Sequence, residues 1–129
     1  MSDFFGVTVP FIEHCGIHGV EHGKNWTVTE VSIQPELTNS IGIGHGGLIM
    51  TLLDVTMGSA ARLSEPNSKA VLTIDLHTRF FRPAKSRVVC RAEVTSRTAY
   101  TAFCEASVYD SESQLIARGM ATFKLIYNE

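Results

Sequence analysis

The sequence lacks most features of secreted, membrane-spanning or nucleic-acid-binding proteins. Its 129 residues include only three cysteines and no CxxC pair. A disulfide framework or a zinc site is therefore not expected, and a reducing cytoplasm fits. No apolar run approaches the roughly 18 residues of a membrane span, and the first residues lack the basic and apolar regions of a signal peptide. Eleven basic and thirteen acidic residues give a formal charge of −2, so no global basic field attracts nucleic acid or anionic membrane.

Internal repeats, low-complexity stretches and linkers are also missing. Apolar residues make up 44% of the chain and charged residues 19%, which is the ordinary globular range. We therefore expect residues 1–129 to form a single cytoplasmic domain with one core.

The apolar pattern predicts one long helix and several strands. Residues 48–63 contain no proline and are apolar on nearly every side, which predicts a buried central helix of about four turns. A short helix is expected at residues 11–15, stopped by Gly16. Strands with period-two alternation are expected at 24–34, 70–81, 87–95, 99–109 and 114–126. This order predicts an α+β fold, in which a mostly antiparallel sheet wraps around the central helix.

Two details of the strands are also predicted. In residues 24–34 the apolar parity changes from Trp26 and Val28 to Val31 and Ile33, which indicates a bulge. In residues 70–81 the apolar face carries four residues, whereas Thr73 and its polar neighbours occupy the opposite face. The four are Leu72, Ile74, Leu76 and Phe80.

Asp54 is the residue that does not fit an apolar helix. Its neighbours at three and four positions are methionine, threonine and glycine, and none of them can pair with a carboxylate. A charge in such a place is costly unless it is hydrogen-bonded, hydrated or functional. Asp54 either lies on a hydrated stripe or caps a backbone amide, or it is a catalytic carboxylate in an apolar cleft, where weak solvation favours general-base chemistry.

The start of the same helix is a second candidate. His45, Gly46 and Gly47 open it, and the first backbone amides of a helix have no partners within the helix. Together with the helix dipole they can hold a developing oxyanion, although the two glycines could equally serve only the turn. From Gly47 to Asp54 is about 10 Å along a helix, whereas reacting groups must approach to roughly 3–3.5 Å. The functional interpretation therefore requires a site built from two chains, and hence a homodimer.

The combined motif resembles a known family. The pattern N-x-x-G-x-x-H-G-G, read here from Asn39 to Gly47 and followed by Asp54, is similar to that of the phenylacetate-pathway (PaaI-type) acyl-CoA thioesterases of the hotdog fold. The resemblance continues through residues 72–84 and 115–119 and covers nearly the whole chain. It implies a five- or six-stranded sheet around one long helix, composite sites between paired chains, and dimers that often form tetramers.

The resemblance also implies roles for individual residues. Asp54 would activate water or attack the thioester, and the Gly46 amide would polarise its carbonyl. Asn39 and His45 would orient the carbonyl region, and Thr73 would help to hold the water. The chain departs from the family at Ser96 and Arg97, where a glycine often occupies the turn.

Other clusters have weaker patterns. Four basic residues surround the Pro83 turn: Arg79, Arg82, Lys85 and Arg87. They are either an ordinary solvated strand end or contacts for the phosphates of coenzyme A. In the second case the Gly47 backbone would also contact the substrate. His14, His18 and His22 have the spacing of metal ligands on a helix, but glycines interrupt any helix there. No metal site and no cofactor beyond the coenzyme A of the substrate are therefore expected.

These observations favour an acyl-CoA thioesterase that acts as a homodimer or homotetramer. Two other functions fit the same fold. One is a hydratase or dehydratase acting on enoyl-CoA, for which His45 and Asp54 could supply the acid and base. The other is a non-catalytic acyl-CoA-binding module, because a fold does not by itself establish activity.

Overall fold

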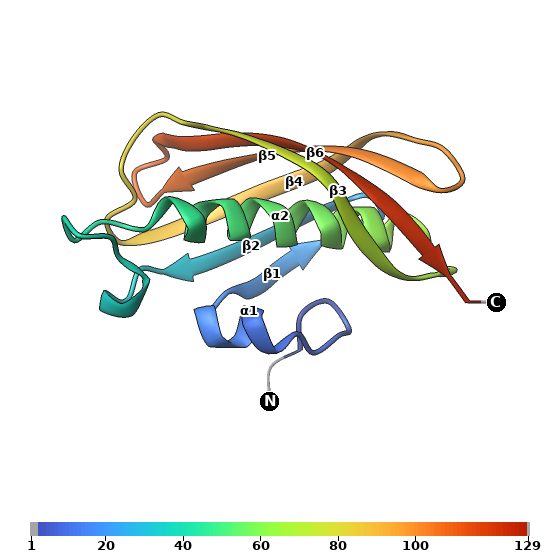
Figure 1. Ribbon diagram of the computed structural model, residues 1–129, viewed down its shortest axis with the longest axis horizontal. Helices are drawn as coiled ribbons and strands as arrows, with labels where there is room; N and C mark the ends of the chain where they lie inside the picture. Colours follow the sequence, from blue (N-terminus) through green and yellow to red (C-terminus); the bar gives the residue numbers. More distant parts are fainter. Residues whose placement is uncertain (1–2, 129) are drawn as a thin grey trace.

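A six-stranded antiparallel sheet curls around one long helix, α2 (Gly46–Leu63), in the computed structural model, which describes residues 3–128 (Figure 1). The strand order is β1-β2-β4-β5-β6-β3, so β1 and β3 form the edges. The remaining elements are α1 (Pro10–Cys15), β1 (His18–His22), β2 (Trp26–Ser32), a 3-10 turn (Pro35–Leu37), β3 (Ser68–Phe80), β4 (Arg87–Arg97), β5 (Thr101–Asp110) and β6 (Leu115–Tyr127). This confirms the predicted hotdog fold.

The core lies between α2 and the concave face of the sheet. Leu52, Leu53 and Met57 are fully buried on the helix. The strands facing them carry small side chains, which let a helix with bulky residues pack close to the sheet. These small residues are Ala92, Ala102, Ala106, Ala117 and Ala121. Such packing fixes the rotation of α2, and therefore the direction in which Asp54 points.

The predicted bulge in residues 24–34 is wrong. The pairing of β2 with β4 runs without a shift, and the irregularity lies in β1, between Gly19 and Glu21. The apparent parity change arises because two threonines of β2 face the helix. Thr27 Oγ1 donates to the Thr56 carbonyl oxygen at 2.6 Å, and the hydroxyls of Thr29 and Thr56 are 2.7 Å apart. Their polar groups are satisfied, so burial costs little.

The predicted apolar face of residues 70–81 is also largely wrong. Leu72, Ile74 and Phe80 are 59%, 58% and 50% exposed, and of the four only Leu76 packs against the core. The register between β3 and β6 shifts between Thr73 and Asp75, leaving Ile74 unpaired. This bulge turns Thr73 toward α2, whereas Leu76, beyond the bulge, packs against the core. The edge position of β3 leaves Leu72 and Ile74 without covering neighbours.

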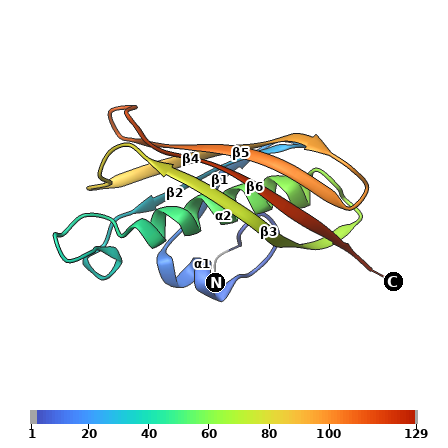
Figure 2. The same ribbon diagram turned by 45° about the horizontal axis from the view of Figure 1, so that its top comes forward.

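The N-terminal segment covers the side of α2 that the sheet leaves open (Figures 1 and 2). The predicted short helix is present as α1, and Gly16 ends it with a left-handed φ of 74°. Ile12 and Cys15 are its buried residues. Strand β1 is not predicted by the apolar pattern, because all five of its residues are exposed and give no alternation.

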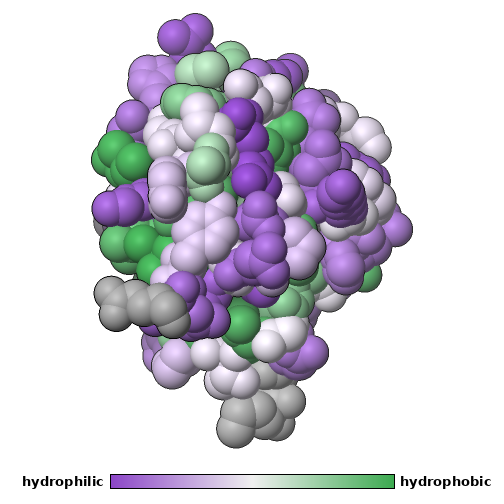
Figure 3. All heavy atoms as spheres, turned by 90° about the vertical axis from the view of Figure 1, so that its right-hand side faces the viewer, coloured by the Kyte–Doolittle hydropathy of each residue, from purple (hydrophilic) through white to green (hydrophobic). Residues whose placement is uncertain are grey.

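The departure at Ser96 and Arg97 has a structural explanation. Both residues lie in β4, so the turn to β5 comes later than predicted. Arg97 donates to the Ser64 carbonyl oxygen at 2.8 Å and pairs with Glu65 at 3.1 Å, which ties this end of the sheet to the end of α2. Figure 3 views that end of the molecule, where hydrophilic surface alternates with smaller hydrophobic areas. No helix among residues 3–128 is long and apolar enough to cross a membrane.

Candidate active site

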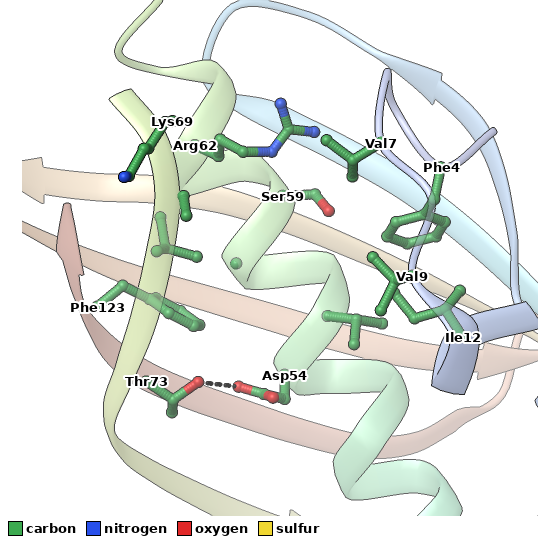
Figure 4. Close-up of a pocket in the computed structure, with 14 residues that line it drawn as sticks. Phe4, Val7, Val9, Ile12, Asp54, Ser59, Arg62, Lys69, Thr73 and Phe123 are labelled. Atoms are coloured by element: carbon green, nitrogen blue, oxygen red, sulfur yellow. Dashed lines mark hydrogen bonds between the residues drawn. The ribbon is translucent and has the colours of Figure 1, made fainter. Parts of the chain in front are cut away.

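Asp54 lies halfway along α2 and meets one polar partner from the sheet (Figure 4). Thr73 Oγ1 donates a hydrogen bond of 2.7 Å to Asp54 Oδ1. No cation among residues 3–128 forms a salt bridge with this carboxylate. Burial raises the pKa of Asp54, and the hydrogen bond from Thr73 opposes part of that rise. The carboxylate is therefore a stronger base than a solvated aspartate.

A pocket of about 350 Å³ begins at Asp54 and Thr73 and extends toward the C-terminal end of α2. Its floor is the helix, with Gly58 giving room, and one wall is β3 with Phe123 behind it. The opposite wall is the N-terminal segment, which contributes Phe4, Val7, Val9 and Ile12. A mainly apolar pocket with few polar groups is typical of a small-molecule site.

The N-terminal wall was not identified from the sequence. Its residues are apolar, but they are separated by Gly6, Thr8 and Pro10 and follow neither helical nor strand spacing. The only sequence signal for this wall was the presence of apolar residues in a segment that fits neither a helix nor a strand.

At the start of α2, one backbone amide is left free. Gly47 N donates to His45 Nδ1 at 2.8 Å, and the amides of Leu48 and Ile49 donate to the His45 carbonyl oxygen. The Gly46 N–H has no acceptor among residues 3–128. It lies at the positive end of the helix dipole, where an anion is favoured. The Gly46 amide is therefore free to donate to a ligand, whereas the Gly47 amide is already paired.

The same contacts define the state of the His45 ring. Nδ1 accepts the hydrogen bond from Gly47 and so carries no proton. The proton of the neutral ring is then on Nε2, where it is available as a donor. His45 is the N-cap of α2, with φ −62° and ψ 139°.

Asn39 shapes the loop before the helix. Its side-chain carbonyl oxygen accepts from Ile41 N at 3.1 Å and from Ile43 N at 3.2 Å. Gly42, inside this turn, has a φ of 79°, which favours glycine. The Asn39 side-chain nitrogen forms no hydrogen bond among residues 3–128 and is available as a donor.

The four residues of the predicted basic cluster have different local partners. Arg82 donates to the Leu115 carbonyl oxygen at 2.8 Å, and Arg87 forms an ion pair with Glu30. Arg79 stands opposite Arg118 in the sheet register. The loop that carries Lys85 lies against the loop before α2, because Gly44 N donates to the Ala84 carbonyl oxygen at 2.7 Å.

A single chain brings together only part of the predicted site. Asp54 and Thr73 are in contact, whereas Asn39, His45 and Gly46 lie at the start of α2. Because α2 is continuous from Gly46 to Leu63, eight residues separate Gly46 from Asp54, or about 12 Å along the axis. His14 lies in α1, whereas His18 and His22 lie in β1. No group of three metal-ligating side chains converges within residues 3–128.

Comparison with known proteins gives a consistent family. Residues 41–117 match the thioesterase superfamily. The chain is 31% identical to human acyl-coenzyme A thioesterase 13 over 98 residues, covering 74% of this chain and 69% of that protein. It is also 31% identical over 93 residues to a Halobacterium salinarum protein named as an esterase, covering 66% of this chain but only 62% of that protein.

A solved structure supports the fold independently. The PaaI protein of the Escherichia coli phenylacetic acid degradation operon superposes with a TM-score of 0.85 at 16% identity, over 92% of this chain and 85% of that one. Together with the superfamily match, this confirms the resemblance that the Asn39–Asp54 motif indicated. The chain belongs to the thioesterase superfamily of thioester hydrolases and has the hotdog fold.

Proposed function

We propose that the protein is an acyl-CoA thioesterase that hydrolyses a coenzyme A thioester to the free acid and coenzyme A. One observation carries this proposal: Asp54, a half-buried carboxylate with no cationic partner among residues 3–128, opens onto a mainly apolar pocket in a chain of the thioesterase superfamily. The name of the human relative, acyl-coenzyme A thioesterase 13, supports the substrate class.

In the proposed reaction the Asp54 carboxylate removes a proton from water as the water oxygen attacks the thioester carbonyl carbon. Alternatively, Asp54 attacks that carbon itself and the resulting anhydride is hydrolysed. In either route the carbon–sulfur bond breaks, and the sulfur leaves and takes a proton. Thr73, which donates to Asp54 Oδ1, orients the carboxylate and helps to hold the water. Both routes need ionised Asp54, so kcat/KM should fall as pH decreases through its raised pKa.

The carbonyl oxygen becomes negative in the transition state and needs donors. We assign this role to the Gly46 N–H, which has no acceptor among residues 3–128, supported by His45 Nε2–H and the side-chain nitrogen of Asn39. Donors that are already positioned stabilise the developing charge without reorganisation. No metal and no bound cofactor take part in this scheme.

Because Gly46 and Asp54 of one chain are too far apart to act on one carbonyl, we propose that each site combines the helix start of one chain with Asp54 and Thr73 of another. The β3 edge offers a surface for this pairing. It is thirteen residues long and presents the exposed side chains of Leu72 and Ile74. Long apolar edges are normally covered, and a second copy would cover them in a symmetric dimer. Two such dimers could form a tetramer.

For the coenzyme we propose that Lys85 and Arg82, with Arg79, bind phosphates. Lys85 lies on a loop next to the segment that carries Asn39 and His45, so its cation belongs to the same end of α2 as the proposed donors to the carbonyl. The three free, buried cysteines fit a reducing compartment, so we propose a cytoplasmic location.

A thiol-release screen tests the function directly. Purified protein is mixed with aryl, short, medium and long acyl-CoA substrates, and free coenzyme A is measured with a thiol reagent. We expect turnover of at least one class. An enoyl-CoA is followed in parallel for hydration, and hydration without thiol release would contradict the proposal, as would tight binding of acyl-CoA without turnover.

A further inference from the structure

The pocket beside Asp54 follows one stripe of α2. Asp54, Gly58, Ser59 and Arg62 all line it, and their spacing places them along one side of the helix. From Asp54 to Arg62 is eight residues, or about 12 Å. An extended chain advances roughly 3.6 Å per three bonds, so this length accommodates about ten bonds. A medium-length chain attached at the thioester therefore reaches the Arg62 end.

Between its two ends the pocket is apolar. The N-terminal segment closes one side with Phe4, Val9 and Ile12, and β3 closes the other with Val71. Gly58 keeps the floor low, because a Cβ there would lie 3.3 Å from the Phe123 ring and 3.4 Å from Val71. These walls suit methylene groups and offer no hydrogen bonds from side chains along the middle of the pocket.

The far end is polar and incompletely satisfied. Ser59 is only 7% exposed; its hydroxyl makes no hydrogen bond among residues 3–128 and is not among the fully buried polar atoms that lack a partner, so it is accessible from the pocket that Ser59 lines. Arg62 lies one turn further along and is partly buried, which lowers its pKa, while the charge of Asp3 raises it. Its Nη2 donates to the Phe5 carbonyl oxygen at 2.5 Å, but no carboxylate among residues 3–128 forms a salt bridge with it. Figure 4 shows both side chains pointing toward the N-terminal segment.

We infer that the acyl group is a chain of about eight to ten carbons that ends in a second carboxylate, bound by Arg62 and Ser59 at the far end of the pocket. This inference rests on the proposed thioesterase function and specifies its substrate class. A guanidinium and a hydroxyl are matched donors for a carboxylate. Lys69 also lines the pocket, but its amino group points away from α2 (Figure 4). Arg62 is therefore the cation that would bind the carboxylate at the end of the acyl chain.

The test compares substrates that differ only at the chain end. Rates are measured for the mono-CoA thioesters of suberic and sebacic acid against octanoyl-CoA and decanoyl-CoA. We expect kcat/KM to be at least about 10-fold higher for the dicarboxylic substrates, because their chain-end carboxylate accepts charge-assisted hydrogen bonds from Arg62 and Ser59 that a methyl end cannot accept. Arg62→Met should abolish the preference, and Arg62→Lys should retain part of it. Lys69→Met is the matched control and should leave the preference unchanged.

In the alternative case, Arg62 binds a phosphate of the coenzyme. Substrates with a shorter thiol portion that lacks the phosphates distinguish the two cases. With N-acetylcysteamine thioesters of the same acids, the preference and its loss in Arg62→Met should persist if Arg62 binds the acyl end. A preference seen with coenzyme A and lost with N-acetylcysteamine would overturn the inference. So would equal rates for both acid types together with an unchanged ratio in Arg62→Met.

A binding measurement keeps the inference testable if no thioester is hydrolysed, an outcome that would refute the proposed function. Calorimetry then compares monomethyl suberate with methyl octanoate. Wild type should bind the charged ester at least about 10-fold more tightly, and Arg62→Met should lose that difference. Equal binding of the two esters by folded wild-type protein would overturn the inference.

Discussion

At the scale of single residues, Asp54 decides whether the protein is a hydrolase. Asp54→Asn keeps the shape of the side chain and an oxygen that accepts from Thr73, but it removes the base. We expect thioesterase turnover to fall by about 100-fold or more, with the fold and assembly unchanged. Steady-state kinetics and circular dichroism of the purified variant measure both effects. Wild-type turnover in the variant would refute the role of Asp54.

The same substitution has an effect on stability that depends on pH. The folded state raises the pKa of Asp54 above its ordinary value of 3.8, so the folded state binds the proton more tightly than the unfolded state. The stabilising effect of this group is complete below the ordinary pKa and is lost as pH rises through the raised pKa. Asp54→Asn should therefore be more stable than wild type at neutral pH.

Urea unfolding over a series of pH values checks this expectation. The difference in the free energy of unfolding between variant and wild type should shrink as pH falls toward the ordinary pKa of aspartate. Asp75, exposed on β3, supplies the control, because Asp75→Asn tests the effect of removing a solvated charge. A variant that is less stable than wild type at neutral pH would contradict the sign.

Gly46 allows its amide to be removed cleanly. It is the first residue of α2, where proline is favoured, and His45 has the extended backbone that precedes proline well. A Cβ at Gly46 would make only ordinary contacts, at 3.7 and 3.8 Å, with the Phe80 ring. We expect Gly46→Pro to fold but to lose roughly 100-fold or more in kcat, as when an oxyanion donor is removed.

Gly46→Ala is the matched control, because it adds the Cβ and keeps the N–H. It should retain most of the activity. Equal losses in the two variants would show that the space at Gly46, and not its amide, matters to catalysis. Thermal melting of both variants checks that neither has unfolded.

A functional residue can be identified from the sequence when its side chain differs in polarity from the residues around it. Asp54 was detectable because a carboxylate in an apolar helix is costly, and the helix start because its glycines precede an apolar run. Ser59 was not detectable, because a serine in a helix can be buried or exposed with little change in pattern. The threonines at 27 and 29 gave the wrong face for β2 for a related reason: hydroxyls that find partners are buried without any apolar signal.

At the scale of elements, the loop between β3 and β4 is predicted to act on the coenzyme. Replacing Arg82 and Lys85 by alanine should raise KM for acyl-CoA several-fold and change kcat less, because distant phosphate contacts are made equally in the ground and transition states. The loss of the Arg82 hydrogen bond to Leu115 could loosen the loop, so the Arg82→Lys and Lys85→Arg pair serves as a charge-retaining control.

An N-acetylcysteamine thioester separates these explanations in the same experiment. It lacks the phosphates, so its hydrolysis should be indifferent to the alanine substitutions. An equal loss on both substrates would show that these residues act through the structure of the loop.

Elements with a regular period were predicted well, and those with an interruption were not. The central helix and five strands follow from apolar spacing alone. The bulge at Ile74 did not, because a single unpaired residue leaves the alternation in the sequence intact while it reverses the faces in the structure. The edge strand β1 was not predicted for a different reason: its residues are exposed on both faces, which removes the alternation from the sequence.

At the scale of the whole molecule, one chain does not contain a complete proposed site. The free amide of Gly46 and the carboxylate of Asp54 lie about 12 Å apart along a rigid helix, and no loop movement within one chain shortens that helix. The paired site therefore predicts that light scattering finds no active monomer at assay concentration. Sequence reasoning could reach this conclusion because helix geometry is universal, whereas the depth of the pocket depends on the placement of the N-terminal segment.

Mixed dimers test the shared site directly. Asp54→Asn and Gly46→Pro, each inactive alone, are co-expressed with different affinity tags, and the mixed species is purified through both tags. In a symmetric dimer, each site takes its amide from one chain and its carboxylate from the other. The mixed dimer then has one site with both lesions and one with neither, so activity should return to about half of the wild-type value per dimer.

A site contained in one chain gives a different result, because every site in the mixture would then carry one lesion and activity would stay lost. Mixed dimers of Asp54→Asn with Thr73→Val provide the control, since the 2.7 Å hydrogen bond places both residues in the same half of a site. Each site of that dimer carries one lesion, so its activity should not exceed the mean of the two parent variants. Recovery with Gly46→Pro but not with Thr73→Val would assign the helix start and the Asp54–Thr73 pair to different chains, and no recovery in verified mixed dimers would refute the composite site.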